Sequence, residues 1–509
     1  LMNAFLMYRD RDFDLSDPLP RNETELTQDL ELTTLFDAMA HGDRFLLDVA
    51  RRAILVSLTD PEAIIYRQQV LDDCLANPEV VRAIYDIAIA AIEDERKVYF
   101  ILSRNSPDVV LHRSLEVMEL YLVELRRLRR LAEENAALFR SPGFRRFCAM
   151  IMSELDDAYL QSVDDHLKEL RFRHGVLISA EIGKNNKGTH YVLRQSPEPG
   201  WMERLSLASG PGYSFHIADR DENGFKALAE LKGRGINMVA NALGQSADHI
   251  RNFFALLRVE LAFHIGCLNL HEGLMAKGEA LCFPEPVAAN QTALTARGLY
   301  DPALSLHVQP RVVGNDVDAD GKRLIMITGA NQGGKSTFLR SLGVAQLMMQ
   351  AGMLVAAESF RANVCTGVFT HYKREEDAGM ESGKLDEELS RMSNIADQIT
   401  PNGLLLGNES FAATNEREGS EIARQVVRAM METGIKVIFV THLFDLAHGF
   451  YRQGLETTLF LRAERRSDGQ RTFHIVAGEP LPTSYGEDSY RRIFGAESSV
   501  ATATVSAGR

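Results

Sequence analysis

The chain has 509 residues, of which 45% are hydrophobic, and its formal net charge at pH 7 is −14. This length gives room for about three domains of roughly 150 residues each, and the apolar share is that of a protein with buried cores. The acidic balance excludes a protein coated in nucleic-acid-binding surface, because phosphate contacts need Lys and Arg, but it leaves open a local basic patch or a ring around DNA.

The sequence predicts neither a membrane protein nor a secreted one. We find no run of about 18 apolar residues that would form a transmembrane helix. Residues 1–20 contain a short apolar run without a basic leader, so they do not resemble a signal peptide. The cysteines are scattered, which argues against a zinc site or a disulfide framework and fits a reducing cytoplasm. They are Cys74, Cys148, Cys267, Cys282 and Cys365.

The first half of the chain predicts helices. Apolar residues recur at three- and four-residue spacing, which is typical of amphipathic helices. The stretches with this pattern are 43–58, 59–76, 78–95, about 108–136 and 223–276. The basic cluster Arg126–Arg130 lies in one of them; we favour a solvated helix face over a DNA contact for it, since basic helix faces are common.

A short strand pair is expected at residues 175–195, where two β-prone runs flank the sequence GKNNKG. Basic side chains make its tip a candidate DNA contact, although hairpin tips are often polar simply because they are solvated. The candidate DNA-binding residues are Lys184, Lys187 and Arg194.

Beyond residues 282–298 the pattern changes to alternating strands and helices, which predicts an α/β domain with a mostly parallel sheet. Buried strands are expected at 323–329, 403–409 and 436–442, and helices at 336–352 and 420–434.

The sequence GANQGGKS at 329–336 matches the phosphate-binding pattern G-x-x-x-x-G-K-S between a predicted strand and a predicted helix. Glycines let backbone N–H groups turn inward around phosphates, and the helix N-terminus adds partial positive charge. Lys335 would contact the β- and γ-phosphates of ATP, and Ser336 would bind Mg²⁺. The predicted nucleotide-binding residues are Gly329, Ala330, Asn331, Gln332, Gly333, Gly334, Lys335, Ser336 and Thr337.

Two later strands end in residues suited to ATP hydrolysis. At the end of the first strand, Asn408 and Glu409 occupy the positions where P-loop ATPases have Asp-Glu. His442 ends the next predicted strand. Glu409 is the candidate base and a second metal-binding residue, and an amide oxygen at Asn408 can accept the hydrogen bond that the Asp would accept, but without charge. We therefore expect slow hydrolysis.

Together these segments resemble the ATPase domain of the MutS family of DNA mismatch-repair proteins. The similar segments are 327–358, 382–395, 439–446 and 483–490, and residues 290–495 resemble the family well. The helical residues before them are similar, more loosely, to the family's core, lever and clamp regions.

The resemblance implies a helical lever and clamp region followed by a P-loop ATPase domain of the ABC type. We place the helical region at 1–285, with a clamp-like β insertion near 175–215, the ATPase domain at 286–495 and a disordered tail at 496–509. The resemblance to the MutS family also implies a homodimer in which Ser382 reaches the partner's ATP. It further implies that ATP moves the helical levers around DNA.

The sequence departs from the family pattern in ways that shape this expectation. We see no room for the mismatch-recognition and connector domains, and we interpret FPE at 283–285 as a chance match to the Phe-x-Glu wedge. Duplex or branched DNA, in repair or recombination, is therefore the expected ligand rather than a mismatch. Val312 and Val313 stand where the family has an adenine-stacking aromatic.

Two alternatives remain open from the sequence. An ATP-gated scaffold could bind a protein partner with its levers and no nucleic acid, which the acidic charge favours modestly. A small-molecule kinase is less favoured, because it explains neither His442 nor the helical half of the chain.

Overall fold

The structure, a computed structural model, describes residues 2–99, 106–173, 175–184, 187–195, 215–330, 332–374, 383–466 and 471–481. The chain divides into two compact units, which we call the helical unit (Leu1–Phe5 and Asn77–Leu261) and the α/β unit (Leu6–Ala76 and Ala262–Arg509). The sequence analysis places a single boundary at 285–286, whereas these units interleave along the chain. The expected combination of helices with a mostly parallel sheet is confirmed.

The helical unit is built from long helices whose starts are set by proline and by capping side chains. Pro107 and Pro142 open α6 and α7, and Ser141 and Asp156 cap α7 and α8 by accepting backbone N–H groups. The tilted rings of Tyr121 and Phe254, 5.8 Å apart, belong to its core. Its helices are α5 (Pro78–Tyr99), α6 (Pro107–Asn135), α7 (Pro142–Glu154), α8 (Asp157–Leu170) and the larger part of α9 (Glu222–Met275).

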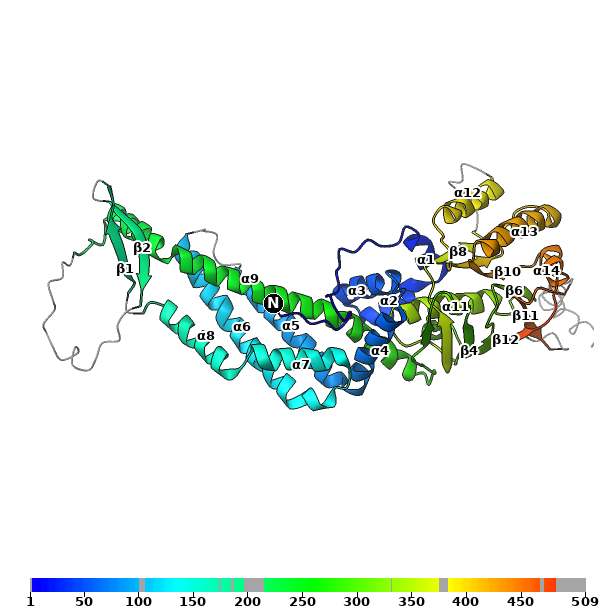
Figure 1. The fold of residues 1–509 in the computed structure, drawn as a ribbon, viewed down its shortest axis with the longest axis horizontal. Helices are drawn as coiled ribbons and strands as arrows, with labels where there is room; N and C mark the ends of the chain where they lie inside the picture. Colours follow the sequence, from blue (N-terminus) through cyan, green and yellow to red (C-terminus); the bar gives the residue numbers. More distant parts are fainter. Residues whose placement is uncertain are drawn as a thin grey trace, which may run out of the picture. The chain divides into compact units, whose positions relative to one another are not determined.

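The predicted strand pair is confirmed. Strand β1 (Leu177–Ile182) pairs antiparallel with β2 (Gly188–Arg194), with a bulge between Ser179 and Glu181. The hairpin lies beside the beginning of α9, where Ile178 approaches Gly235 (Figure 1).

Helix α9 contains one window long and apolar enough to cross a membrane. Of that window, 78% is buried inside the structure, and a buried core helix of a folded protein passes the same test of length and composition. The window is therefore weak evidence for a membrane span.

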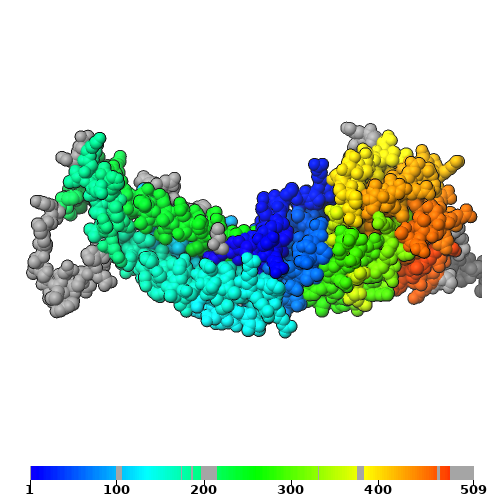
Figure 2. Space-filling model, viewed as in Figure 1, coloured from blue at the N-terminus to red at the C-terminus, as the bar shows by residue number. Residues whose placement is uncertain are grey.

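The α/β unit begins with four helices, of which α1 packs against strand β8 (Val368–Tyr372) and α4 against strand β3 (Glu285–Val287). They are α1 (Glu23–Asp29), α2 (Leu32–Ala40), α3 (Arg44–Leu55) and α4 (Pro61–Ala76). The buried guanidinium of Arg67 on α4 donates to the carbonyl oxygens of Met7 and Ala351, at 3.1 and 2.9 Å. In Figure 2 the blue surface of this segment adjoins the green and yellow surface of the residues that follow in the same unit.

A six-stranded sheet forms the centre of the α/β unit, in the order β12-β11-β6-β10-β9-β8. All neighbouring pairs are parallel except β11 and β12. The apolar runs of β6, β9 and β10 are buried almost throughout, as expected for strands covered on both faces. The strands are β6 (Leu324–Gly329), β8 (Val368–Tyr372), β9 (Leu404–Asn408), β10 (Lys436–Val440), β11 (Thr458–Arg465) and β12 (Arg471–Ala477).

Helices surround this sheet, and a smaller sheet lies beside it. The helices are α10 (Pro302–His307), α11 (Lys335–Gln350), α12 (Lys384–Ala396), α13 (Glu416–Glu432) and α14 (Phe444–Tyr451). The smaller sheet has the order β3-β7-β4-β5, from β3 (Glu285–Val287), β4 (Leu294–Leu299), β5 (Asn315–Asp318) and β7 (Ser359–Asn363). Buried Lys436 joins the two sheets, since its Nζ donates to Ala293 O and Asn363 Oδ1.

Candidate functional site

The turn at 329–336 joins the buried strand β6 to helix α11, as the sequence predicts. Gly329 and Gly334 have φ of +105° and +88°, which favours glycine. A Cβ on Gly333 would lie 2.7 Å from the Cβ of Ala463, so this position also needs glycine. Because α11 begins at Lys335, the first amides of that helix have no partner within it and are available to an anion. Asn331 lies outside the described residues.

Lys335 lies against the turn and is almost fully buried. Its Nζ donates to the carbonyl oxygens of Gly329 and Ala330, each at 2.9 Å. Burial lowers the pKa of this amine, the Glu409 carboxylate raises it, and Arg471 lowers it further. A polyanion bound here would favour the charged ammonium for the same reason that Glu409 does.

The predicted segment 403–409, which carries Asn408 and Glu409, lies directly beside this turn. The hydroxyl of Ser336 donates to Oδ1 of Asn408 at the end of β9, at 2.9 Å. The next residue, Glu409, is fixed by its backbone N–H, which donates to Val440 O of β10 at 2.9 Å. Parallel pairing of β9 with β10 thus places the carboxyl ends of both strands at one edge, where ligands bind in such sheets.

His442 lies close to Glu409, as expected for residues that follow neighbouring strands: Glu409 comes directly after β9, and His442 comes two residues after β10, which ends earlier than predicted. Its Nδ1 is 4.0 Å from Oε2 of Glu409, and the two side chains are 38% and 31% exposed. Both groups therefore remain accessible to solvent and to a ligand at this edge.

The oxygen donors at this edge suit a hard divalent cation. Ser336, Asn408 and Glu409 offer a hydroxyl, an amide oxygen and a carboxylate, and Mg²⁺ binds through few protein oxygens together with substrate phosphates and waters. Over the described parts of the chain, no group of three or more His, Cys, Asp or Glu side chains could hold a metal ion. The donor set fits Mg²⁺ that arrives with a nucleotide.

A cavity of about 400 Å³ opens next to the turn. Its walls are largely apolar and come from three segments of the α/β unit, at 299–315, 332–341 and β12. Val312 and Val313 line it, and so does the ring of Phe473, which is 50% exposed. Asn315 holds β12 in place, since its Nδ2 donates to Phe473 O and its Oδ1 accepts from Ile475 N.

The hydroxyl of Tyr300 is a polar feature of this cavity. Tyr300 lines the cavity, its side chain is buried, and its hydroxyl has no hydrogen-bond partner among the described residues. A buried phenol without a partner costs free energy.

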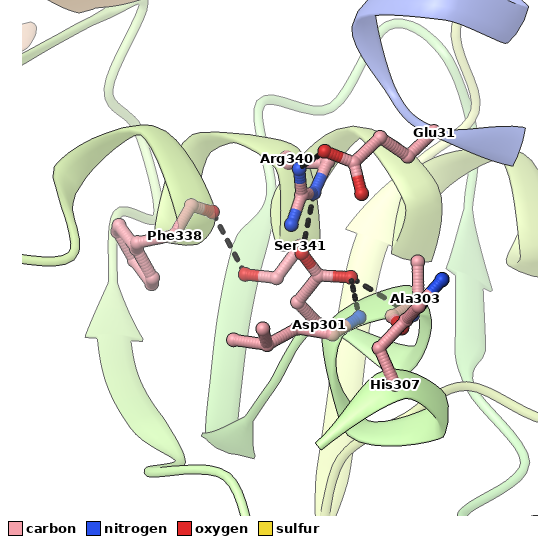
Figure 3. Close-up of polar contacts among 8 residues, drawn as sticks. Glu31, Asp301, Ala303, His307, Phe338, Arg340 and Ser341 are labelled. Carbon is pink, nitrogen blue, oxygen red and sulfur yellow. Dashed lines mark hydrogen bonds and ion pairs between the residues drawn. The ribbon is translucent and has the colours of Figure 1, made fainter. Parts of the chain in front are cut away.

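An ion-pair network supports the inner wall of the cavity (Figure 3). Arg340 on α11 pairs with buried Asp301 and with Glu31, so the helix that follows the turn is tied to α10 and α2. Asp301 also caps α10 by accepting the backbone N–H groups of Ala303 and Leu304. Burial raises the pKa of the Asp301 carboxyl and Arg340 opposes this shift.

The loop that carries Glu409 has an unusual backbone. Glu409 and Phe411 have φ of +53° and +62°. Such left-handed conformations cost about 1–3 kcal/mol each outside glycine, and they persist at functional sites only where the surroundings hold them.

The candidate DNA-binding residues lie together in the helical unit. Lys184, Lys187 and Arg194 are all exposed on the β1–β2 hairpin. Arg194 Nε donates to Ser179 Oγ at 2.9 Å, which leaves its other donors facing solvent.

The basic cluster on α6 pairs mainly with acidic neighbours. Arg127 pairs with Glu124 at 2.9 Å, Arg129 pairs with Asp157, and Arg126 lies 3.8 Å from Asp164. These ion pairs agree with the interpretation of this cluster as a solvated helix face.

Several predicted residues lie outside the described part of the chain. They are Ser382, the segment 483–490 and the predicted tail 496–509. Of the segment 382–395, the structure describes the part that forms α12.

Sequence reasoning missed Phe473, Tyr300, His371 and Ser410. Phe473 had a usable signal: residues 458–477 contain two β-prone runs on either side of Asp468-Gly469, a frequent hairpin pair. His371 lies in a run of aromatic and β-branched residues at 368–372 that predicts a strand. For Tyr300 and Ser410 we find no local signal.

Comparison with known families matches two regions of the chain. Residues 59–277 match the MutS2 N-terminal domain, and residues 325–506 match MutS domain V. Each is a region of similarity, and together they cover both the helical and the α/β parts of the chain.

Individual relatives agree with these family matches. The chain is 28% identical over 335 residues to the DNA mismatch repair protein MutS of Chlorobium chlorochromatii, which covers 62% of this chain and 37% of the relative. It is 28% identical over 201 residues to the endonuclease MutS2 of Lacticaseibacillus casei (38% and 25%), and 25% identical over 257 residues to a DNA mismatch repair protein MutS of Chloroflexus aurantiacus (48% and 25%). The matched regions thus span 25–37% of the length of these curated relatives.

Proposed function

Since the chain belongs to the MutS family, we propose that it binds and hydrolyses ATP and that the ATP cycle switches a DNA-binding assembly. The single observation that carries the nucleotide part is the hydrogen bond of 2.9 Å between Ser336 and Asn408. It joins two segments 72 positions apart in the sequence, and the phosphate-binding and hydrolytic roles both require that they meet.

In this proposal the turn at 329–336 binds the triphosphate with its backbone amides, and Lys335 contacts the β- and γ-phosphates. Ser336 and Glu409 would hold Mg²⁺, which supplies charge neutralisation at the phosphates when it is bound. Asn408 accepts the Ser336 hydrogen bond without adding negative charge, which supports slow hydrolysis.

Glu409 orients the attacking water and His442, 4.0 Å away, contacts the same region. The exposure of both side chains supports these roles, because a water and a γ-phosphate must reach them. The cavity beside the turn takes the nucleobase, with Phe473 as an aromatic wall in place of the family's aromatic near Val312 and Val313.

DNA is the proposed partner of the helical unit. The relatives are described as DNA mismatch repair proteins and as an endonuclease, and the basic hairpin at β1–β2 offers exposed cations for a phosphate backbone. A homodimer in which Ser382 contacts the partner's ATP, a preference for duplex or branched DNA and a cytoplasmic location complete the proposal.

Phosphate release and DNA binding test the two parts separately. Wild type should release phosphate from ATP with Mg²⁺, and Lys335→Ala and Glu409→Gln should each abolish release, the first through binding and the second through chemistry. A labelled duplex and a four-way junction, titrated at low and high salt with and without ATP, measure the DNA part. No binding of either DNA at low salt would overturn it.

A second candidate function is an ATP-gated scaffold that binds a protein instead of DNA. The net charge of −14 and the ion-paired arginines of α6 favour it. Capture of a protein partner that survives nuclease treatment, combined with absence of DNA binding, would decide for the scaffold.

A further inference from the structure

A buried histidine connects the loop that carries Glu409 to helix α12. His371 on β8 is fully buried, and its Nδ1 lies 2.7 Å from the hydroxyl of Ser410, the residue after Glu409. Its Nε2 lies 3.0 Å from the carbonyl oxygen of Glu388 on α12. One imidazole ring therefore bridges two segments that are not neighbours in the sequence.

The partners of the ring define its protonation. Because Nε2 faces a carbonyl oxygen, it carries the proton, and Nδ1 is left to accept from the Ser410 hydroxyl. The same hydroxyl lies 2.7 Å from the carbonyl oxygen of His371, so its one proton faces two acceptors. Burial, and then the nearby Arg391, lower the pKa of His371 to about 4, and the bridge is therefore neutral at physiological pH.

Further contacts hold the Glu409 loop to His371 and helix α12 to β8. Burial raises the pKa of the Glu388 carboxyl and the backbone of Phe411 opposes this shift, while the ring of Phe411 stacks on His371 with centroids 5.3 Å apart. Arg391 of the same helix donates to Tyr372 O at 3.0 Å, which fixes α12 to the end of β8. The loop thus contacts His371 through Ser410 and Phe411, and His371 in turn contacts α12 through the carbonyl oxygen of Glu388.

The loop needs such support because its backbone is strained. Glu409 and Phe411 both have positive φ, and residues in this conformation relax unless their surroundings hold them. A Cβ on Gly419 would lie 2.4 Å from Phe411 O, so α13 packs closely on the other side of the loop. The direction of the Glu409 side chain therefore depends on contacts made by Ser410 and Phe411.

We propose that His371 is a positioning residue that couples the Glu409 loop to α12, so that the rate of ATP hydrolysis depends on the placement of this helix. The inference rests on the proposed function, in which Glu409 orients the attacking water. It assigns α12 a regulatory contact within its own subunit, separate from the proposed role of Ser382 toward the partner.

Two substitutions break the contact between His371 and Ser410, one from each side. In His371→Gln the side-chain amide reaches the Glu388 carbonyl in place of Nε2, but the contact to Ser410 is lost; Ser410→Ala removes the same contact from the other side. Both variants should lower kcat for ATP by about 10- to 100-fold, because a small displacement of a catalytic group has effects of this size. The KM for ATP should stay within about twofold, since the turn at 329–336 is untouched.

A matched control is present in the same unit. His264 is also fully buried, and its Nε2 lies 3.3 Å from the carbonyl oxygen of Leu6. Among the described residues it has no hydrogen bond or ring contact with the site. His264→Gln should lose stability as His371→Gln does and keep the wild-type kcat. An equal loss of kcat in the control would show that general destabilisation explains the effect and would overturn the proposal.

Hydrogen exchange supplies a measurement that does not need ATP hydrolysis. In His371→Gln and Ser410→Ala, amides of residues 404–415 and of α12 should both exchange faster than in wild type and in His264→Gln. Faster exchange in the loop alone, with α12 unchanged in both variants, would overturn the coupling. If wild type does not hydrolyse ATP, the proposed function fails, while the exchange experiment still decides whether the loop and α12 are coupled.

Discussion

The cavity beside the turn predicts that Phe473→Ala weakens ATP binding without disturbing the phosphate site. Stacking of a base on an aromatic side chain is worth about 1–3 kcal/mol, and because the Phe473 ring is half exposed we expect the lower part of that range, about 1–2 kcal/mol. This corresponds to about 5- to 30-fold weaker binding. The strand itself should stay in place, because Asn315 holds it through the backbone of Phe473 and Ile475.

The assay is competition against a fluorescent ATP analogue, with ATP and with inorganic tripolyphosphate as competitors. Phe473→Ala should weaken ATP and leave tripolyphosphate unchanged, because tripolyphosphate has no base, whereas Lys335→Ala should weaken both. Phe473→Tyr keeps the ring and should bind ATP as wild type does. Unchanged ATP affinity in Phe473→Ala would refute the placement of the base in this cavity, and an equal loss for both competitors would show that the turn has moved.

Three further predictions follow from the site, the hairpin and the buried histidines. Asn408→Asp should preserve or raise the rate of phosphate release, because it restores a charged acceptor for Ser336; a complete loss would show that the amide has a role of its own. Replacing the three hairpin cations with Ala should weaken the salt dependence of duplex DNA binding. The slope of the logarithm of the association constant against the logarithm of the salt concentration should become less negative by about 2.7, which is about 0.9 for each lost phosphate contact. An unchanged slope would show that the hairpin does not contact the DNA backbone. The three hairpin cations to be replaced are Lys184, Lys187 and Arg194. Burial lowers the pKa of His371 in the folded state to about 4, below the ordinary histidine value of about 6.5. Its contribution to stability is therefore present above about pH 6.5 and is lost as the pH falls toward 4. The difference in unfolding free energy between wild type and His371→Gln, measured in urea, should therefore shrink across this window by up to about 1.4 kcal/mol per pH unit, and a difference that is independent of pH would contradict a neutral buried imidazole.

The sequence predicted the parts of the site that depend on local pattern. The glycines of the 329–336 turn are tied to backbone angles and close approaches that only glycine accepts, so spacing alone identified them. The ends of β9 and β10 were predictable too, because buried apolar runs mark parallel strands and their carboxyl ends meet at one edge. These features need no knowledge of distant contacts.

The parts that the sequence did not reveal depend on contacts between distant segments. Phe473 enters the cavity because β12 pairs with β11 and is held by Asn315, 158 positions away. His371 reaches Ser410 only because β8 pairs with β9, and each side chain alone is an ordinary polar residue in a strand or loop. The left-handed backbone at Glu409 was likewise not predictable, because the residue there is not a glycine, which would have indicated this conformation.

In the proposed function, the affinity for ATP and the rate of hydrolysis depend on different parts of the fold. The groups proposed to bind ATP, which are the turn, Lys335 and the cavity, lie on β6, α11 and β12. Glu409 follows β9, its backbone is bonded to β10, and we propose that β8 and α12 position it. Asn408 accepts the hydrogen bond of Ser336, which belongs to the groups proposed to bind ATP, and it directly precedes the strained loop that carries Glu409. Asn408 is therefore the residue at which the binding groups and the hydrolytic loop join. A neutral amide there keeps the hydrogen bond that aligns the two segments and omits the charge that an Asp would add beside the proposed Mg²⁺. A chain built in this way would keep its nucleotide affinity while its turnover depends on the loop, which is the behaviour of a switch that stays long in its ATP-bound form.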